Sequence, residues 1–227
     1  MKYLTGDGVD VDFNKAAYWL EKAVNQQHAD AQHALGMMHL GGDGVDKNID
    51  RGLSLISKAS DQGLAGAQND LGMIYYNGKF VRKDLKKAVE LLTKSAEQGL
   101  YIAQFNLGRM YEEGSGVVKD SKKAFEWWNK SSMQGYSIAQ YNLSRLYGTG
   151  EGVDRNIELS AYWTLKAAEQ GLPEAQNTAG ILYEEGAGVT KDEKTAFDWY
   201  SKAASAGHKS AKTNLKLLCK KNPSVCK

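Results

Sequence analysis

Proline, cysteine and long apolar runs are all scarce in this chain of 227 residues. Two prolines leave room for many helices, because proline breaks the interior of a helix. No apolar run approaches the roughly 20 residues of a membrane-spanning helix. The net charge is only +2, so no basic field indicates nucleic acid as a partner. Hydrophobic residues make up 42% of the chain, enough to bury a core and to argue against general disorder.

What the chain does contain is one pattern repeated at a constant spacing of 36 residues. An Ala-Gln pair begins at Ala31, Ala67, Ala103, Ala139 and Ala175, and Ala211 stands at the same register. Leu-Gly, tyrosine, glycine and valine follow at fixed distances, and a second apolar segment comes after them. A period of this length is typical of repeat arrays, in which each unit buries its apolar face only against its neighbours.

Each repeat is predicted to fold as two helices, A and B. Helix A has apolar residues at its positions 1, 5, 8 and 9, for example Ala67, Leu71 and Ile74, which share one helical face. Helix B is preceded by the good N-cap residues Asp12, Asn48, Asp84, Asp120, Asn156 and Asp192. It is followed by glycines suited to a left-handed C-cap at Gly63, Gly99, Gly135, Gly171 and Gly207.

Helix A also carries an internal glycine, which costs about 1 kcal/mol relative to alanine. It recurs as Gly36, Gly72, Gly108 and Gly180. This recurrence predicts a point where two helices approach too closely for a side chain.

The predicted fold is all-α, a right-handed α/α superhelical solenoid of about twelve helices with the A helices on the concave side. One array is expected to span 1–227. Its parts are a truncated repeat at 1–30, full repeats at 31–66, 67–102, 103–138, 139–174 and 175–210, and a C-terminal capping helix and tail at 211–227.

The pattern A-x-x-x-L-G-x-x-Y-x-x-G-x-G-V-x-x-D-x-x-x-A-x-x-W-x-x-K-A-A-x-x-G resembles the Sel-one-like repeat family, a relative of the tetratricopeptide repeats. The resemblance covers nearly the whole chain, and the segment from Ala103 is almost consensus. Local departures are Phe80 for the second loop glycine, Gln27 for a C-cap glycine and Ser144 for the glycine of helix A. The resemblance implies an adaptor or recognition protein, common in bacteria and often found in the envelope or secreted.

The two ends of the chain suggest further expectations. Met1 shares the register of Met37 and Met73. The chain is therefore expected to be a fragment of a longer array, from which the upstream repeats and any signal peptide are missing. A naturally short N-terminal cap is the alternative. Cys219 and Cys226 are the only cysteines. A disulfide between them is expected to stabilise the fold by roughly 2–3 kcal/mol and favours the periplasm or secretion; two reduced thiols are the alternative.

Catalytic and metal-binding patterns are not found in the sequence. The stretch from Gly72 to Phe80 departs from a phosphate-binding loop in spacing and lacks its Ser or Thr. The four histidines do not cluster, and no Cys/His spacing for zinc exists. We therefore expect no enzyme activity, no cofactor, no metal and no small-molecule substrate.

Positions 3, 7 and 10 of helix A are predicted to face away from its core stripe. Aromatic residues, methionine and arginine, which are enriched in protein interfaces, are frequent at these positions. The candidate partner-binding residues are His33, Met37, Asn69, Met73, Tyr76, Phe105, Arg109, Tyr141, Arg145 and Ile181. Leu40 shares position 10 with Tyr76. The alternative is that these side chains pack one A helix against the next.

The sequence therefore favours a module that binds another protein on its concave surface, as an adaptor in a bacterial envelope or signalling assembly. An alternative is an immunity protein that neutralises a secreted phospholipase-type effector. A hydrolase is the alternative of a different class. A basic run of Lys79, Arg82, Lys83, Lys86 and Lys87 is either a solvated face or an electrostatic docking patch. The lysine-rich segment 209–227 is interpreted as a polar cap, with binding to nucleic acid or anionic lipid as the alternative.

Overall fold

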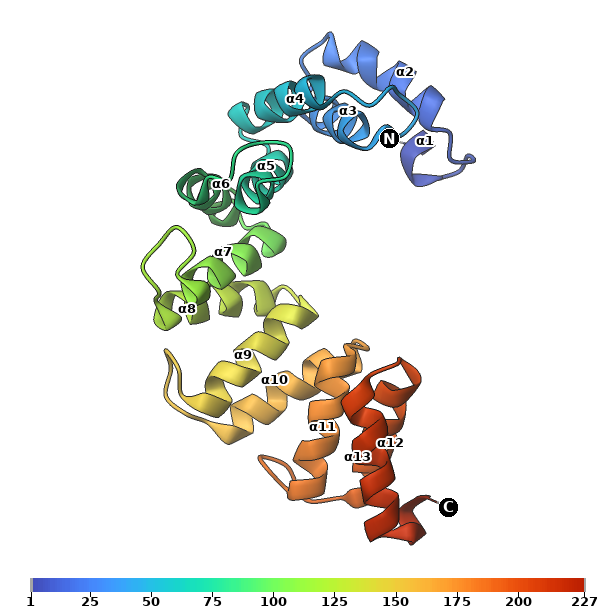
Figure 1. Ribbon diagram of the computed structural model, residues 1–227, viewed down its shortest axis with the longest axis vertical. Helices are drawn as coiled ribbons and strands as arrows, with labels where there is room; N and C mark the ends of the chain where they lie inside the picture. The colour runs from blue at the N-terminus through green and yellow to red at the C-terminus, as the bar shows by residue number, and fades with distance from the viewer. Residues whose placement is uncertain (1, 227) are drawn as a thin grey trace. The chain divides into compact units, whose positions relative to one another are not determined.

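The computed structural model describes residues 2–226, which contain thirteen α-helices, one short 3-10 helix and no strand (Figure 1). The A helices are α1 (Lys2–Thr5), α3 (Ala29–Gly41), α5 (Ala65–Asn77), α7 (Tyr101–Glu113), α9 (Ser137–Thr149), α11 (Pro173–Glu185) and α13 (Lys209–Lys221). The B helices are α2 (Phe13–Val24), α4 (Ile49–Asp61), α6 (Leu85–Glu97), α8 (Ser121–Met133), α10 (Ile157–Glu169) and α12 (Glu193–Ser205). The 3-10 helix η1 spans Pro223–Cys226. The predicted all-α solenoid, built from consecutive helix pairs, is confirmed.

Two compact units divide the chain and are described separately. The N-terminal unit comprises residues 2–107 and 115–117, and the C-terminal unit comprises 108–114 and 118–226. Within each unit, helices that are adjacent in sequence pack on each other, as α3 does on α4 and α9 on α10. In the part of the chain described here, no helix has the length and apolar character needed to cross a bilayer.

The predicted caps form at both ends of helix B. All six N-cap side chains accept a backbone N–H at 2.8–3.0 Å, from residue 194 in α12 and from the third residue after the cap elsewhere. The five glycines after helix B have φ between +88° and +92°, the left-handed region that ends a helix. Gln27 takes the same role at φ +61°. The local sequence thus fixes where each B helix begins and ends.

The glycines inside helix A mark a close approach to helix B of the same repeat, as predicted. A Cβ atom at Gly108 would lie 2.5 Å from the Trp128 ring, and one at Gly180 would lie 2.5 Å from the Tyr200 ring. The departure at Ser144 is matched by a small residue, because Thr164 occupies the register of Trp128 and Tyr200. Ser144 and Thr164 are both buried, so the extra side chain is accommodated by a smaller facing one.

Hydrogen bonds between glutamine side chains explain why Gln follows Ala in the repeated Ala-Gln pair. The sequence alone does not reveal these bonds. Gln68 is buried and donates through Nε2 to the Ser60 carbonyl at 3.3 Å. Its Oε1 accepts from Gln98, the residue after α6, at 2.7 Å. The same bonds recur from Gln62 to Gln32 and from Gln170 to Gln140. Gln68 and Gln140 each join the start of an A helix to the ends of two B helices.

A cysteine pair and polar contacts with α12 hold the C-terminal end of α13 in place. The Sγ atoms of Cys219 and Cys226 lie 2.01 Å apart. Asn222 donates to Glu193 at 2.8 Å, and the Lys221 ammonium lies 3.5 Å from the same carboxylate. Oxidation of this cysteine pair in the mature protein stays a prediction: mass spectrometry of native protein should show two hydrogens lost, and labelling of both thiols would contradict it.

Candidate partner-binding site

Position 3 of helix A connects neighbouring A helices. The Asn69 Oδ1 accepts from Asn106 Nδ2 at 3.0 Å, and Asn69 is only 6% exposed. His33 Nε2 lies 2.7 Å from Asp70 Oδ2 in the next A helix. The expectation that position 3 is exposed is therefore wrong for Asn69. The reason is that in a stacked array an A helix packs against the next A helix as well as against its B helices.

The same contact recurs in the C-terminal unit. The Tyr141 hydroxyl lies 3.1 Å from the Thr178 hydroxyl, and Asn214 donates to Asn177 at 3.0 Å. Each bond joins position 3 of one repeat to position 4 of the next. Tyr141 keeps part of its surface, as does Phe105 in the N-terminal unit. Position 3 is thus chiefly structural.

Position 7 is more open. Met37 is 42% exposed, Arg145 is exposed and Met73 is half-buried. Arg109 lies 3.9 Å from the Glu113 carboxylate on its own helix, and Ile181 packs on the core around Tyr200.

Position 10 is mixed. Leu40 is buried, contrary to the expected exposure, because it packs in the core between α4 and α5. Tyr76 is half-buried, and the Lys83 ammonium lies 5.5 Å from the centre of its ring.

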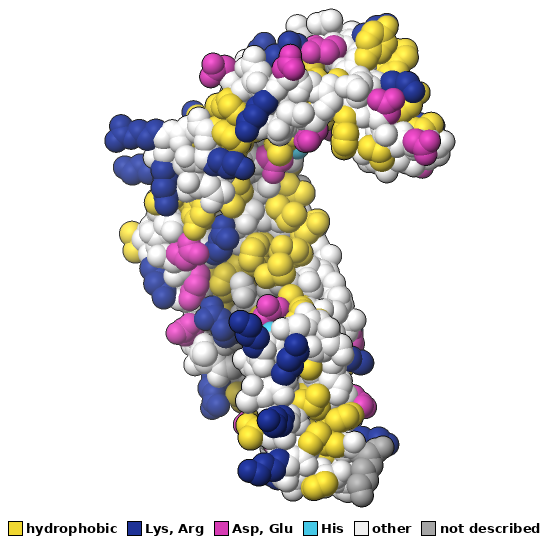
Figure 2. All heavy atoms as spheres, turned by 45° about the vertical axis from the view of Figure 1, so that its right-hand side comes forward, with side chains coloured by type: hydrophobic (Ala, Val, Ile, Leu, Met, Phe, Trp, Pro, Cys, Tyr) yellow, Lys and Arg dark blue, Asp and Glu magenta, His cyan; other side chains and the backbone are white. Residues whose placement is uncertain are grey.

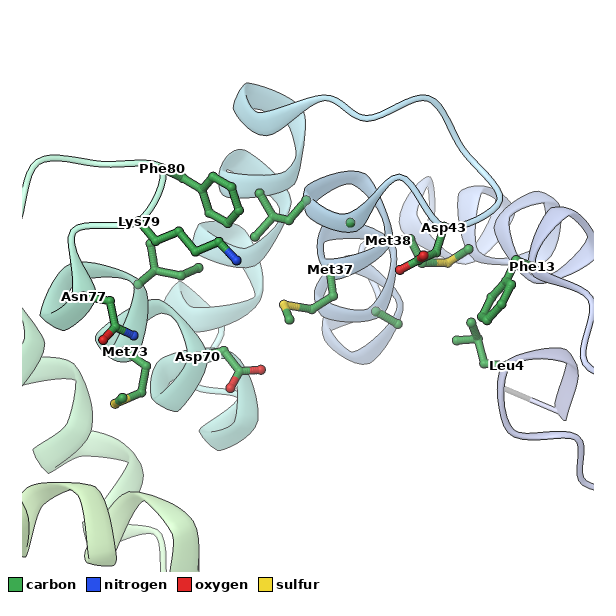
Figure 3. A pocket seen from close by; sticks show the side chains of 14 residues that line it. Leu4, Phe13, Met37, Met38, Asp43, Asp70, Met73, Asn77, Lys79 and Phe80 are labelled. Carbon is green, nitrogen blue, oxygen red and sulfur yellow. The ribbon is translucent and has the colours of Figure 1, made fainter.

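Met37 and Met73 line an open apolar pocket of about 580 Å³ in the N-terminal unit (Figure 3). Helices α1, α2, α3 and α5 contribute to it, as do the loops after α3 and α5. Its lining residues are Leu4, Phe13, Ala34, Met37, Met38, Leu40, Gly41, Asp43, Asp70, Met73, Ile74, Asn77, Lys79 and Phe80. Figure 3 shows Phe80, Lys79 and Met73 on one side of Met37, and Phe13 and Leu4 on the other.

Phe80 is the most unusual residue of this pocket. Its φ is +73°, in the left-handed region, where side chains other than glycine are strained. The other repeats have glycine here, and a Cβ atom at Gly44 would lie 2.4 Å from the Phe13 backbone. Phe80 instead packs against the hydrophobic core cluster that α4, α5 and α6 share with Leu40. A strained residue that lines an open pocket is a signal of function.

Polar groups stand among the apolar walls of the pocket. Both carboxylate oxygens of Asp70 are engaged, one with His33 at 2.7 Å and the other with Asn69 at 3.0 Å. Asp43 lies in the loop after α3, and the Lys79 ammonium lies 4.9 Å from the centre of the Phe80 ring. The pocket therefore offers a flexible methionine and aromatic surface with charges of both signs. Methionine surfaces adapt to varied partners.

Within residues 2–226, no three His, Cys, Asp or Glu side chains lie close enough together to hold a metal ion. The helical period of the sequence predicts Met37 and Met73 as partner contacts but gives no such prediction for Phe80, Phe13 or Asp43. In the sequence, Phe80 stands out only as a departure from the repeat. That departure was the available signal, because it places a large side chain where the backbone requires positive φ.

Comparisons with known proteins agree with the repeat assignment. The model of the Sel1 repeat matches residues 3–28, 29–64, 65–100, 102–136, 137–172 and 173–208. No significant match is found among curated protein sequences.

Several solved structures are similar. A protective antigen of uropathogenic Escherichia coli with an SLR fold is 31% identical, with a TM-score of 0.90 over 97% of this chain and 47% of its own. A Sel1 repeat protein of Oxalobacter formigenes is 34% identical, with a TM-score of 0.85 over 96% of this chain and 63% of its own. The chain therefore spans about half to two thirds of these relatives. An immunity protein of Pseudomonas aeruginosa, 23% identical with a TM-score of 0.54 over 87% of this chain and 75% of its own, shares the fold.

Proposed function

Because this chain belongs to the Sel1 repeat family, whose fold is typically a non-catalytic scaffold for binding other proteins, we propose that it binds a partner protein through the apolar pocket around Met37. The partner presents a segment with at least one large apolar side chain, which enters between Met37, Met73 and Phe80. An adaptor role in a bacterial envelope or signalling assembly fits such a module. The cysteine pair supports an oxidising compartment such as the periplasm.

One observation carries this proposal: Met37 is exposed beside other apolar side chains in a concave site. Its volume of about 580 Å³ lies within the range of about 300–1,000 Å³ that is typical of binding pockets. Burying a large apolar side chain there contributes roughly 1.5–3 kcal/mol. Figure 2 shows further hydrophobic side chains on the surface of the N-terminal end of the chain.

The proposal is tested by site-specific photo-crosslinking. A photoreactive side chain replaces Met37, and a matched control replaces Met133, a methionine of α8 that is 71% exposed. The proposal expects one partner to be crosslinked at position 37 and not at position 133 in cells that make the protein. Equal capture at both positions, or at position 133 alone, would contradict it.

An immunity protein is the second candidate. The similar immunity protein supports it through the fold alone. The two functions are separated by co-expression with the captured partner. Rescue of growth from a toxic partner, together with nanomolar one-to-one binding, would identify an immunity protein. A partner that is harmless when expressed alone would favour the adaptor.

A further inference from the structure

A second surface of the N-terminal unit is strongly cationic. The segment from Lys79 to Lys87 contains five cationic residues and one acid, Asp84. Arg82, Lys83, Lys86 and Lys87 line a shallow hollow of about 910 Å³ at the start of α6. Figure 2 shows Lys and Arg side chains projecting at the level of α5 and α6. We call these four residues the cationic patch.

The cationic patch forms no ion pair with the part of the chain that the structure describes. Among residues 2–226, none of its four cations lies within 4.0 Å of a carboxylate oxygen. Two acids lie near Lys87. Asp84 Oδ1 accepts the Lys87 backbone N–H at 3.0 Å, and Glu90 Oε1 accepts from Lys94 Nζ at 2.6 Å. Like charges so close together repel one another, and this repulsion is relieved when an anionic partner binds.

Only one of the four cations, Arg82, is specific to this repeat, since Lys122 and Lys194 stand at the register of Lys86. Position 83 is Lys or Arg in most repeats, and so is position 87. At the register of Arg82, however, the other repeats have Asp10, Asp46, Val118, Asp154 and Thr190. The preceding repeat also has Asp50 where this repeat has Lys86. The fold therefore accepts acids at both positions, so the cationic excess is not a structural requirement.

Aromatic rings hold two of the lysines at the surface. The Lys83 ammonium lies 5.5 Å from the Tyr76 ring centre, and the Lys87 ammonium lies 4.6 Å from that of Tyr75. A hydrogen bond to the Tyr75 side chain raises the pKa of Lys87 above its ordinary value. Such cation–π contacts fix the side chains without neutralising them.

We propose that the cationic patch is a second docking surface, which binds an acidic segment of a protein. Charge complementarity defines this partner. The acidic residues Asp43, Asp46 and Asp50 of the preceding repeat would direct such a segment away from that repeat and onto α6. Nucleic acid is disfavoured, because it requires an extended basic track, whereas the excess here is confined to nine residues.

The test uses a fluorescent deca-glutamate peptide and two double variants. Arg82→Asp/Lys86→Asp installs the residues of the preceding repeat, Asp46 and Asp50. Lys212→Asp/Lys216→Asp makes the same charge change on exposed residues of α13. Circular dichroism melting checks that both variants fold. We expect the peptide to bind the wild type with strong salt dependence, to bind the first variant about tenfold more weakly, and to bind the second within about twofold.

Three outcomes would overturn the proposal. Equal losses in the two variants would show a bulk charge effect. Tighter binding of a ten-nucleotide oligothymidylate through the same residues would assign the patch to nucleic acid. Preferential binding to phosphatidylserine vesicles would assign it to a membrane surface.

Discussion

Two sets of side chains on the same A helices have different roles. At position 3, Asn69 is buried and bonded to Asn106 of the next A helix. At position 7, only one helical turn further on, Met37 is exposed and lines an open pocket. The difference arises because position 3 bonds to the next A helix, as His33 does to Asp70 and Asn69 does to Asn106, whereas Met37 at position 7 faces the pocket. Residue type alone therefore does not identify a binding surface in a repeat array; the neighbouring helix decides which positions remain available.

The largest effect on stability is expected at position 3. Asn69→Ala removes a buried amide and leaves the partly buried Asn106 amide without this partner, so it should lower the free energy of unfolding by about 1–3 kcal/mol. Met37→Ala, the matched change at position 7, should lower it by no more than about 0.5 kcal/mol, as is usual for surface sites. Urea denaturation measures both. Equal losses would remove the distinction between the two positions.

Phe80 tests the distinction between structural and partner-binding side chains, because it has a strained backbone and also lines the pocket. Phe80→Ala keeps the positive φ and loses the ring, whereas Phe80→Gly also removes the strain. The glycine variant should therefore be more stable than the alanine variant by about 1–2 kcal/mol. Both variants should bind the partner more weakly than the wild type. Unchanged binding in both would mean that Phe80 only fills the core.

The smallest effect concerns Tyr141, a position 3 residue that keeps part of its surface. Tyr141→Phe removes only the hydroxyl contact with Thr178 and should cost about 0.5–1.5 kcal/mol of folding free energy. Partner affinity should stay unchanged if Tyr141 is structural. A thermal melt and a binding titration on one sample give both values, and a loss of affinity without a loss of stability would make Tyr141 a contact residue.

The sequence predicted the fold well because its signals are local and repeated. The N-cap at Asp84, the C-cap at Gly63 and the close approach at Gly108 each depend on neighbours at a fixed register. The pocket could not be predicted in the same way. Its walls come from four helices and two loops, and the helical period of one segment does not reveal that Phe80 and Met37 line the same pocket. Nor does it reveal that Asn69 in α5 bonds to Asn106 in α7.

The central claim is that the partner binds at the pocket around Met37. It is tested most directly by isothermal titration calorimetry with the purified partner that photo-crosslinking identifies. Met37→Glu places a charge in the apolar site and should weaken binding by about 2 kcal/mol or more, the cost typical of a hot spot. Met133→Glu makes the same chemical change on exposed α8 and should leave the affinity within about 0.5 kcal/mol. If Met37→Glu binds as tightly as the wild type, or if Met133→Glu loses as much affinity, the partner does not bind at this pocket.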